Sequence, residues 1–199
     1  MLNIDKMVLG LLEIELESSR KFYEEITQKF GENRRILENR YNEEGVSKES
    51  FEDIRDIIVD DYQEEKEFED LARILVVSHN YFIVEHSLKL LVGNLLKKEG
   101  KPLNDKYKRW GIRNAHVFLK SKGIDLTLVE GYEDCHILNL LVNCIKHNGA
   151  RVSKELARAK NTYKKGEDIK ISPDEVDKYS QAIRLFFSNL INDVVNIKT

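Results

Sequence analysis

Three side chains that can hydrogen-bond or exchange protons lie close together on a helix predicted over residues 133–147. With successive residues 100° apart, His136, Asn143 and His147 fall within about 40° of one another. An imidazole can give or take a proton near neutral pH, and a side-chain amide can bind a phosphate or orient a nucleotide. This stripe predicts a site that faces a partly desolvated cleft. The competing interpretation is an ordinary helix end, with His147 near the negative end of the helix dipole and Asn148-Gly149 as the cap.

The other histidines give no comparable pattern. His79 and His86 are seven residues apart on one predicted helix, about 10 Å, which is too far for both to bind one metal ion without other ligands. His116 fits a surface position and a core position equally well. The chain has no HxxxH or CxxC spacing, no glycine-rich phosphate loop and no GxSxG motif. We therefore expect no metal ion and no cofactor.

The elements that must hold the stripe are helical. Two prolines and ten glycines in 199 residues favour long helices, because helix interiors exclude Pro strongly and Gly mildly. We predict an all-α bundle of about six to eight helices. The segment 64–98 is apolar nearly all round, which predicts a long, largely buried central helix.

The part of the chain before this central helix is predicted to contain three shorter helices. The first covers residues 3–30, with a bend near Ser18-Ser19, and the second ends at Gly45. The third begins near Ser47 and runs to about residue 62.

After the central helix, residues 104–105 are predicted to begin a helix that ends at Gly123. Residues 150–164 are predicted to form another helix or a polar extension. The sequence Ser172-Pro173-Asp174-Glu175 has an N-cap serine, a proline in the first position and acids in the first turn, which together mark the start of a helix. This last helix is predicted to end near Val195.

Charge is distributed unevenly along the chain. Residues 1–70 carry 21 Asp and Glu against 10 Lys and Arg, a net charge of −11, whereas residues 71–199 have a net charge of +8. The positive charge is densest in residues 89–122 and is also high in 146–170. This separation fits a polyanionic partner, two self-complementary surfaces, or solvated faces with a local bias.

The length of the chain fits a single all-α domain over residues 1–199, with acidic helices over 1–62 and a helical core over 64–199. We expect neither a signal peptide nor a membrane span, because charged residues interrupt the N-terminal apolar run and no stretch of about 18 apolar residues occurs. Cys135 and Cys144 are nine residues apart on one helix, roughly 13 Å, which is too far for a disulfide. These features predict a protein of the reducing cytoplasm.

The segment from Asn143 to His147 resembles a motif of the HEPN superfamily, whose members are small helical bundles and include many metal-independent ribonucleases of bacterial defence, toxin–antitoxin and RNA-processing systems. The motif is an Arg, a polar residue, three variable residues and a His near a helix end. In this sequence the polar residue is Asn143, the His is His147, and Val142 stands where the Arg is expected. The resemblance covers about residues 70–195 and implies a homodimer.

If the resemblance extends to function, His147 would act as the acid or base in metal-independent RNA cleavage and Asn143 would bind the phosphate or the nucleotide. His136 and Lys146 are candidate binding residues on the same helix. A replacement for the missing Arg would have to come from another element or from the second copy of a dimer. The candidates are Arg109, Arg113, Arg151 and Arg158.

Three functions fit the sequence. The first is an RNA-directed protein of HEPN type, either a divergent ribonuclease or a non-cleaving RNA binder, in which Tyr107, Trp110 and Tyr163 could stack on bases. The second is a non-enzymatic bundle that binds a protein partner, for example through its acidic N-terminal third. The third is a small-molecule-binding bundle whose pocket is lined by the stripe of His136, Asn143 and His147.

Overall fold

The computed structural model describes residues 4–43, 51–101 and 112–196, and every regular element in these segments is helical. The predicted all-α bundle is therefore confirmed for the described part of the chain. The elements in chain order are α1 (Ile4–Glu43), α2 (Phe51–Lys98), α4 (Ile112–Lys120), the 3₁₀ helix η2 (Leu126–Leu128), α5 (Tyr132–His147), α6 (Lys154–Ala159) and α7 (Pro173–Val195).

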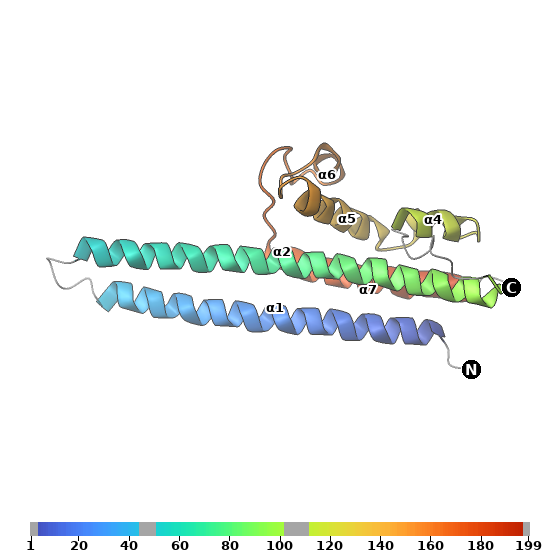
Figure 1. Cartoon of the computed structure of the whole chain (residues 1–199), viewed down its shortest axis with the longest axis horizontal. Helices are drawn as coiled ribbons and strands as arrows, with labels where there is room; N and C mark the ends of the chain where they lie inside the picture. The colour runs from blue at the N-terminus through green and yellow to red at the C-terminus, as the bar shows by residue number, and fades with distance from the viewer. Residues whose placement is uncertain (1–3, 44–50, 102–111, 197–199) are drawn as a thin grey trace.

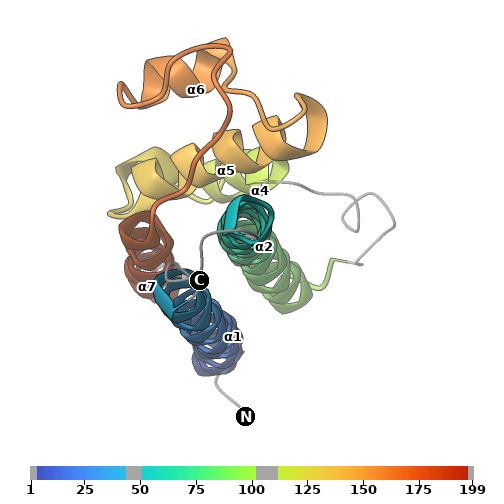
Figure 2. The same ribbon diagram turned by 90° about the vertical axis from the view of Figure 1, so that its left-hand side faces the viewer.

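The helices form two layers. In the first layer α1 and α2 run antiparallel as a long hairpin, and α7 packs along one side of that hairpin, in contact with both helices (Figure 1). In the second layer α5 lies across α2 and α7, with α4 at one end of α5 and α6 at the other (Figures 1 and 2). At about 1.5 Å per residue, α1 and α2 are roughly 60 and 72 Å long. The end of the hairpin formed by the C-terminal part of α1 and the start of α2 extends beyond α7 and the second layer.

The prediction of two helices before residue 45 was wrong, because α1 is continuous over Ile4–Glu43 and passes through both Ser18-Ser19 and Gly31. Local preference at these positions is overridden by packing against α2. The side chain of Ser19 is buried, and the Phe30 ring stacks on Phe68 with ring centroids 6.5 Å apart.

The predicted break near residue 63 was also wrong, because α2 is a single helix over Phe51–Lys98. One side of α2 packs into the core, but a second stripe of apolar side chains on the predicted central helix remains in solvent. Leu75 is 53% exposed and Phe82 is 55% exposed. The helix is therefore central in position without being enclosed all round.

A buried polar relay fixes the register of the three helices in the first layer. The Ser19 hydroxyl donates to Oδ1 of Asn80 at 3.0 Å, and Nδ2 of Asn80 donates to the Ser180 hydroxyl at 3.0 Å. Asn80 is fully buried, and Ser180 in turn donates to the backbone carbonyl of Val176. Both ends of the Asn80 amide are thus satisfied, and each bond fits only one alignment of α1, α2 and α7.

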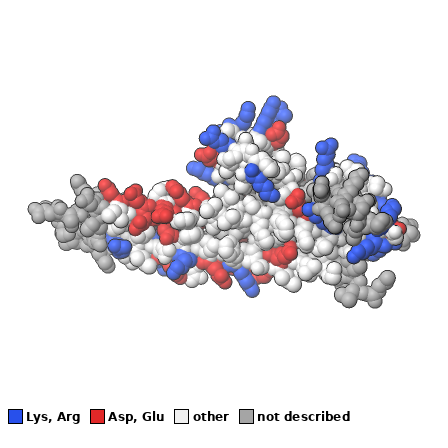
Figure 3. Space-filling view, in the orientation of Figure 1, with Lys and Arg blue, Asp and Glu red and all other residues white. Residues whose placement is uncertain are grey.

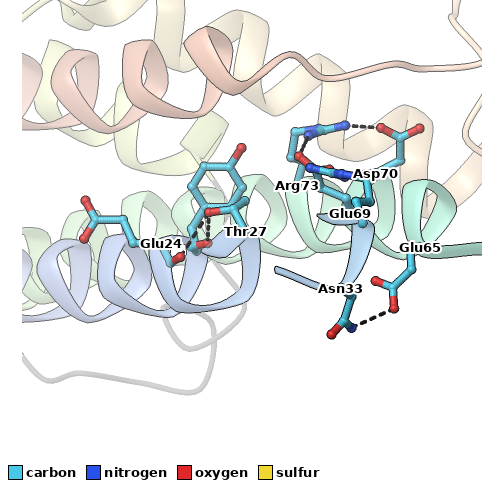
Figure 4. A network of polar contacts seen from close by, with 9 residues as sticks. Glu24, Thr27, Asn33, Glu65, Glu69, Asp70 and Arg73 are labelled. Carbon is cyan, nitrogen blue, oxygen red and sulfur yellow. Dashed lines mark hydrogen bonds and ion pairs between the residues drawn. The ribbon is translucent and has the colours of Figure 1, made fainter. Parts of the chain in front are cut away.

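A second polar network links α1 to α2 near the extended end of the hairpin (Figure 4). The Glu69 carboxylate accepts from Arg34 on α1 and, at 2.7 Å, from Arg73 on its own helix, while Arg73 also pairs with Asp70. Nearby, Nδ2 of Asn33 donates to Glu65 at 2.8 Å. Burial alone raises the pKa of the Glu69 carboxyl, but hydrogen bonds and charge from Arg34 and Arg73 hold it below its ordinary value.

The helices after α2 occur where they were predicted, but some of their first and last residues differ from the predicted ones. Residues 104–105 lie outside the described residues, and α4 is followed by Gly123 with a φ of 86°. Residues 150–164 hold only the short helix α6 and two connecting loops. The predicted start of α7 is confirmed, since Ser172 and Glu175 form a complete capping box and Pro173 is the first helical residue.

Candidate nucleic-acid interface

The helix that carries the predicted site residues is anchored by one apolar face. The buried residues of α5 are Cys135, Ile137, Leu138, Leu141, Val142 and Cys144. Val142, at the position of the expected motif Arg, is 0% exposed and belongs to the main hydrophobic core. A side chain at this position points into the bundle, so it cannot reach a ligand held by Asn143 and His147.

The stripe of His136, Asn143 and His147 faces solvent, because all three residues are exposed. The predicted desolvated cleft along the stripe was therefore wrong. His136 and His147 are eleven positions apart, which is roughly 16 Å along the helix. Only Asn143 and His147, one turn apart, can contact the same small group. The amide of Asn143 donates to Oδ1 of Asn139 at 2.8 Å, which holds Asn143 against its own helix.

His136 belongs to a different cluster at the beginning of α5. Its ring stacks on Tyr132 with ring centroids 6.0 Å apart, and Tyr132 meets the edge of His116 at 6.2 Å. Nε2 of His116 is 3.0 Å from Asp125, which also caps η2 by accepting from Thr127. A hydrogen bond from Lys120, bonds from Thr127 and the contact with His116 hold the pKa of the Asp125 carboxyl well below its usual range. This His–Asp pair was not predicted, although the nine-residue spacing between His116 and Asp125 around Gly123 is visible in the sequence.

A tight turn brings Arg151 back to the end of α5. Gly149 and Ala150 both have positive φ, at 60° and 57°, and Nδ2 of Asn148 donates to the backbone carbonyl of Arg151 at 2.7 Å. The Arg151 side chain is exposed and lies 3.7 Å from Asp168, a weak surface pair. Of the predicted arginines, Arg151 is therefore close in the chain and in the fold to His147.

The remaining predicted binding residues, Lys146 and Arg113, lie at opposite ends of α5. Lys146 is in the last turn of α5, and its Nζ lies 5.6 Å from the centre of the Tyr81 ring of α2. Arg113 is exposed on α4, which packs near the opposite end of α5 (Figure 1). Arg113 therefore does not join His147, and Arg109 lies outside the described residues.

Residues 146–170, which we call the basic head, concentrate positive charge around the end of α5. They contain eight Lys and Arg against Glu155, Glu167 and Asp168. Figure 3 shows Lys and Arg side chains gathered over α6 and its neighbouring loops, whereas acidic side chains cover the far end of the hairpin. Four of the basic side chains are exposed and form no ion pair with another described residue; these are Lys154, Arg158, Lys165 and Lys170.

A partly buried cluster attaches the basic head to the start of α7. Lys160 pairs with Glu175, the Tyr163 hydroxyl donates to the same carboxylate at 3.0 Å, and the Lys160 ammonium lies over the rings of Tyr163 and Tyr179. Burial opposes ionisation of Glu175, but bonds from Lys160, Ser172 and Tyr163 keep its pKa below the ordinary value. Tyr163 is buried, so the prediction that it could stack on a base was wrong; Tyr107 and Trp110 lie outside the described residues.

His79 and His86 are exposed on α2 and stack on either side of Phe82, at 6.1 and 5.8 Å between ring centroids. Within the described residues no three His, Cys, Asp or Glu side chains are grouped so as to hold a metal ion. None of the described helices combines the length and the apolar character needed to cross a bilayer.

Comparison with protein-family models, curated proteins and solved structures finds no match to this chain.

Proposed function

We propose that this protein binds RNA through the basic head and does not cleave it. The observation that carries the proposal is the exposed, largely unpaired positive charge of the head beside Asn143 and His147. Phosphate contacts require Lys and Arg, and they supply most of the affinity for nucleic acid that is not read by sequence. The HEPN resemblance at residues 143–147 supports RNA as the polyanion.

Binding without cleavage follows from the position of Val142. Metal-independent cleavage needs a cation or donor at the phosphate as well as a proton acceptor for the 2′-hydroxyl. The motif position that would bring a guanidinium to the phosphate is occupied by a core residue. His147 and Asn143 remain exposed and can contact RNA, but they lack this partner on their own helix.

The salt dependence of RNA binding tests the proposal. If Lys146, Lys154, Arg158, Lys165 and Lys170 each neutralise one phosphate, the slope of log K against log salt is about −3.5 for a single strand. Raising the salt from 50 to 200 mM then weakens binding roughly 100-fold. A fluorescence anisotropy titration with a labelled single-stranded RNA measures this slope, and a flat response contradicts the proposal.

A pair of charge-matched variants locates the surface. The double variant Lys154→Gln and Lys165→Gln should reduce the slope by about 1.4 and weaken binding at low salt. The control Lys21→Gln and Lys66→Gln removes the same charge from exposed positions on α1 and α2 and should leave the slope unchanged. Equal effects of the two variants would show that binding follows net charge and not the basic head.

Cleavage is tested separately with excess protein and an end-labelled RNA over several hours. We expect the same background cleavage from the wild-type chain and from His147→Ala. Cleavage by the wild-type chain that is lost in His147→Ala would show that the chain is a ribonuclease.

A further inference from the structure

One side of the α1–α2 hairpin, the side away from α7, carries an exposed apolar surface. Figure 3 shows this side as a largely uncharged band between the acidic end of the hairpin and basic side chains at the other end. We call this surface the apolar face. Its large side chains, all at least 41% exposed, are Met7, Leu11, Ile14 and Phe22 on α1 and Phe68, Leu71, Leu75 and Phe82 on α2.

The two halves of the apolar face meet in a groove. The groove has a volume of about 330 Å³ and is lined by Ser18, Ser19, Phe22, Leu75, Val76 and His79. On α2 the exposed apolar residues are Phe68, Leu71, Leu75 and Phe82. They follow the alternating three- and four-residue spacing of a helix–helix seam, in which residue 78 is the one position without an apolar side chain. Eight large apolar side chains on one face of a soluble hairpin indicate a protein interface.

We infer that the apolar face binds the same face of a second copy, with the two α2 helices antiparallel. The charge along α2 selects this orientation. Residues 51–70 of α2 carry ten acids against Arg55 and Lys66, whereas its last part, from Lys89 to Lys98, has three lysines and no acid. Antiparallel α2 helices place the acidic end of each copy beside the basic end of the other, whereas parallel helices would bring the two acidic ends together.

The same arrangement gives a specific register. A twofold axis crossing α2 near residue 77 places Leu71 opposite Phe82 of the partner subunit and Phe68 opposite His86 of the partner subunit. It also places Glu64 opposite Lys89 of the partner subunit. Glu64 and Lys89 are exposed, and they flank the uncharged seam on either side.

The apolar face has the size of a small, reversible interface. Its two strips, from Met7 to Phe22 on α1 and from Phe68 to Phe82 on α2, are each about 22 Å long and roughly 10 Å wide. The resulting area of about 450 Å² per copy is below the roughly 800 Å² that each partner buries in a standard interface, so the charge pairing along α2 must add to the apolar contact.

The dimer would bring the two basic heads to the same edge of the assembly. Lys146 lies over the Tyr81 ring, only four residues from the proposed axis position on α2. The ends of the two α5 helices would then be offset by roughly 12 Å along the direction of α2. The dimer does not depend on RNA binding, so its test is independent of the proposed function.

Sedimentation equilibrium of the full chain tests the interface. We expect a dimer for the wild type and a monomer with unchanged helical circular dichroism for Leu75→Glu. The matched control Leu128→Glu places the same charge on an exposed leucine of η2 and should remain dimeric. A monomeric wild type, or a Leu75→Glu variant that still dimerises, overturns the proposal; if Leu75→Glu fails to fold, Phe82→Ser serves instead, with the same expectation.

A charge-swap experiment tests the antiparallel register. Lys89→Glu places a carboxylate opposite Glu64 of the partner subunit and should raise the dimer dissociation constant roughly tenfold. Adding Glu64→Lys to the same chain restores opposite charges at both symmetry-related positions and should return the constant toward the wild-type value. A double variant that is as weak as Lys89→Glu alone contradicts the register.

Discussion

Replacing Val142 with Arg would restore the residue expected in the HEPN-like motif, and we expect it to unfold the protein rather than create a ribonuclease. Val142 is 0% exposed and is packed among the core residues of α5, α2 and α7. The longer side chain has no route to the surface beside Asn143 without displacing this packing.

The expected loss of stability has two parts. Forcing a larger side chain into a packed core costs about 1–3 kcal/mol. An unpaired buried guanidinium costs several kcal/mol more after the surroundings relax. The total of about 4–8 kcal/mol is comparable with the 5–15 kcal/mol by which a typical domain is stable, so Val142→Arg should be largely unfolded or marginally folded at 25 °C.

Urea unfolding followed by circular dichroism measures the effect, with two controls. Asn143→Arg adds the same side chain one residue further on at an exposed position and should change the free energy of unfolding by about 0.5 kcal/mol or less. Val142→Ala removes volume without adding charge and should cost about 2 kcal/mol. A Val142→Arg protein as stable as Asn143→Arg would refute the reasoning, and RNA cleavage by that variant would show that the position reaches the site.

Three further predictions concern buried ionic and thiol groups elsewhere in the described helices. Glu69→Gln should lower the free energy of unfolding by about 2–4 kcal/mol at pH 7, because it leaves two partly buried arginines without their shared carboxylate, and urea titration checks this. The folded pKa values of Glu69 and Glu175 lie below the ordinary 4.5. Their contribution to stability is therefore complete above about pH 4.5 and is lost as the pH falls through the folded values, and a thermal melt that is flat between pH 6 and pH 3 would contradict this. Burial raises the pKa of the Cys135 thiol to about 12, and Cys144 is equally buried, so a thiol reagent at pH 8 should react with neither in the native chain and with both in denaturant.

The sequence predicted the helices whose signals are local. The start of α7 was correct because Ser172, Pro173 and Glu175 each act on the first turn of their own helix. The continuity of α1 could not be found in this way, because the local signals near residues 18 and 31 are outweighed by contacts with α2, such as Ser19 with Asn80, 61 residues away, and Asn33 with Glu65, 32 residues away. Hydrophobic periodicity shows which face of a helix is apolar, but it does not show whether another helix covers that face.

The same limit explains the candidate site. The angular position of Asn143 and His147 on α5 was predicted correctly, but their burial depends on what lies opposite, and nothing in the described fold covers them. Val142 is 100° from Asn143 on the helix, and this rotation is enough to separate a core position from a surface position. The turn that returns Arg151 to the end of α5 depends on two residues with positive φ, one of which is Ala150, and no sequence rule predicts that conformation for alanine.

The two proposals together give the uneven charge of the chain a physical role. In a monomer the basic head would bind RNA while the acidic end of the hairpin, with its net negative charge, would repel the same RNA strand. In the antiparallel dimer the acidic end of each α2 lies beside the basic end of the other copy's α2, so part of that repulsion is neutralised within the interface. The basic heads, which lie in the second layer, keep their charge for RNA.

Separating the two copies should therefore weaken RNA binding even though every residue of the basic head is intact. Anisotropy titrations of Leu75→Glu beside Leu128→Glu measure this directly. Equal affinities for the monomeric and dimeric variants would show that the acidic end has no influence on the head.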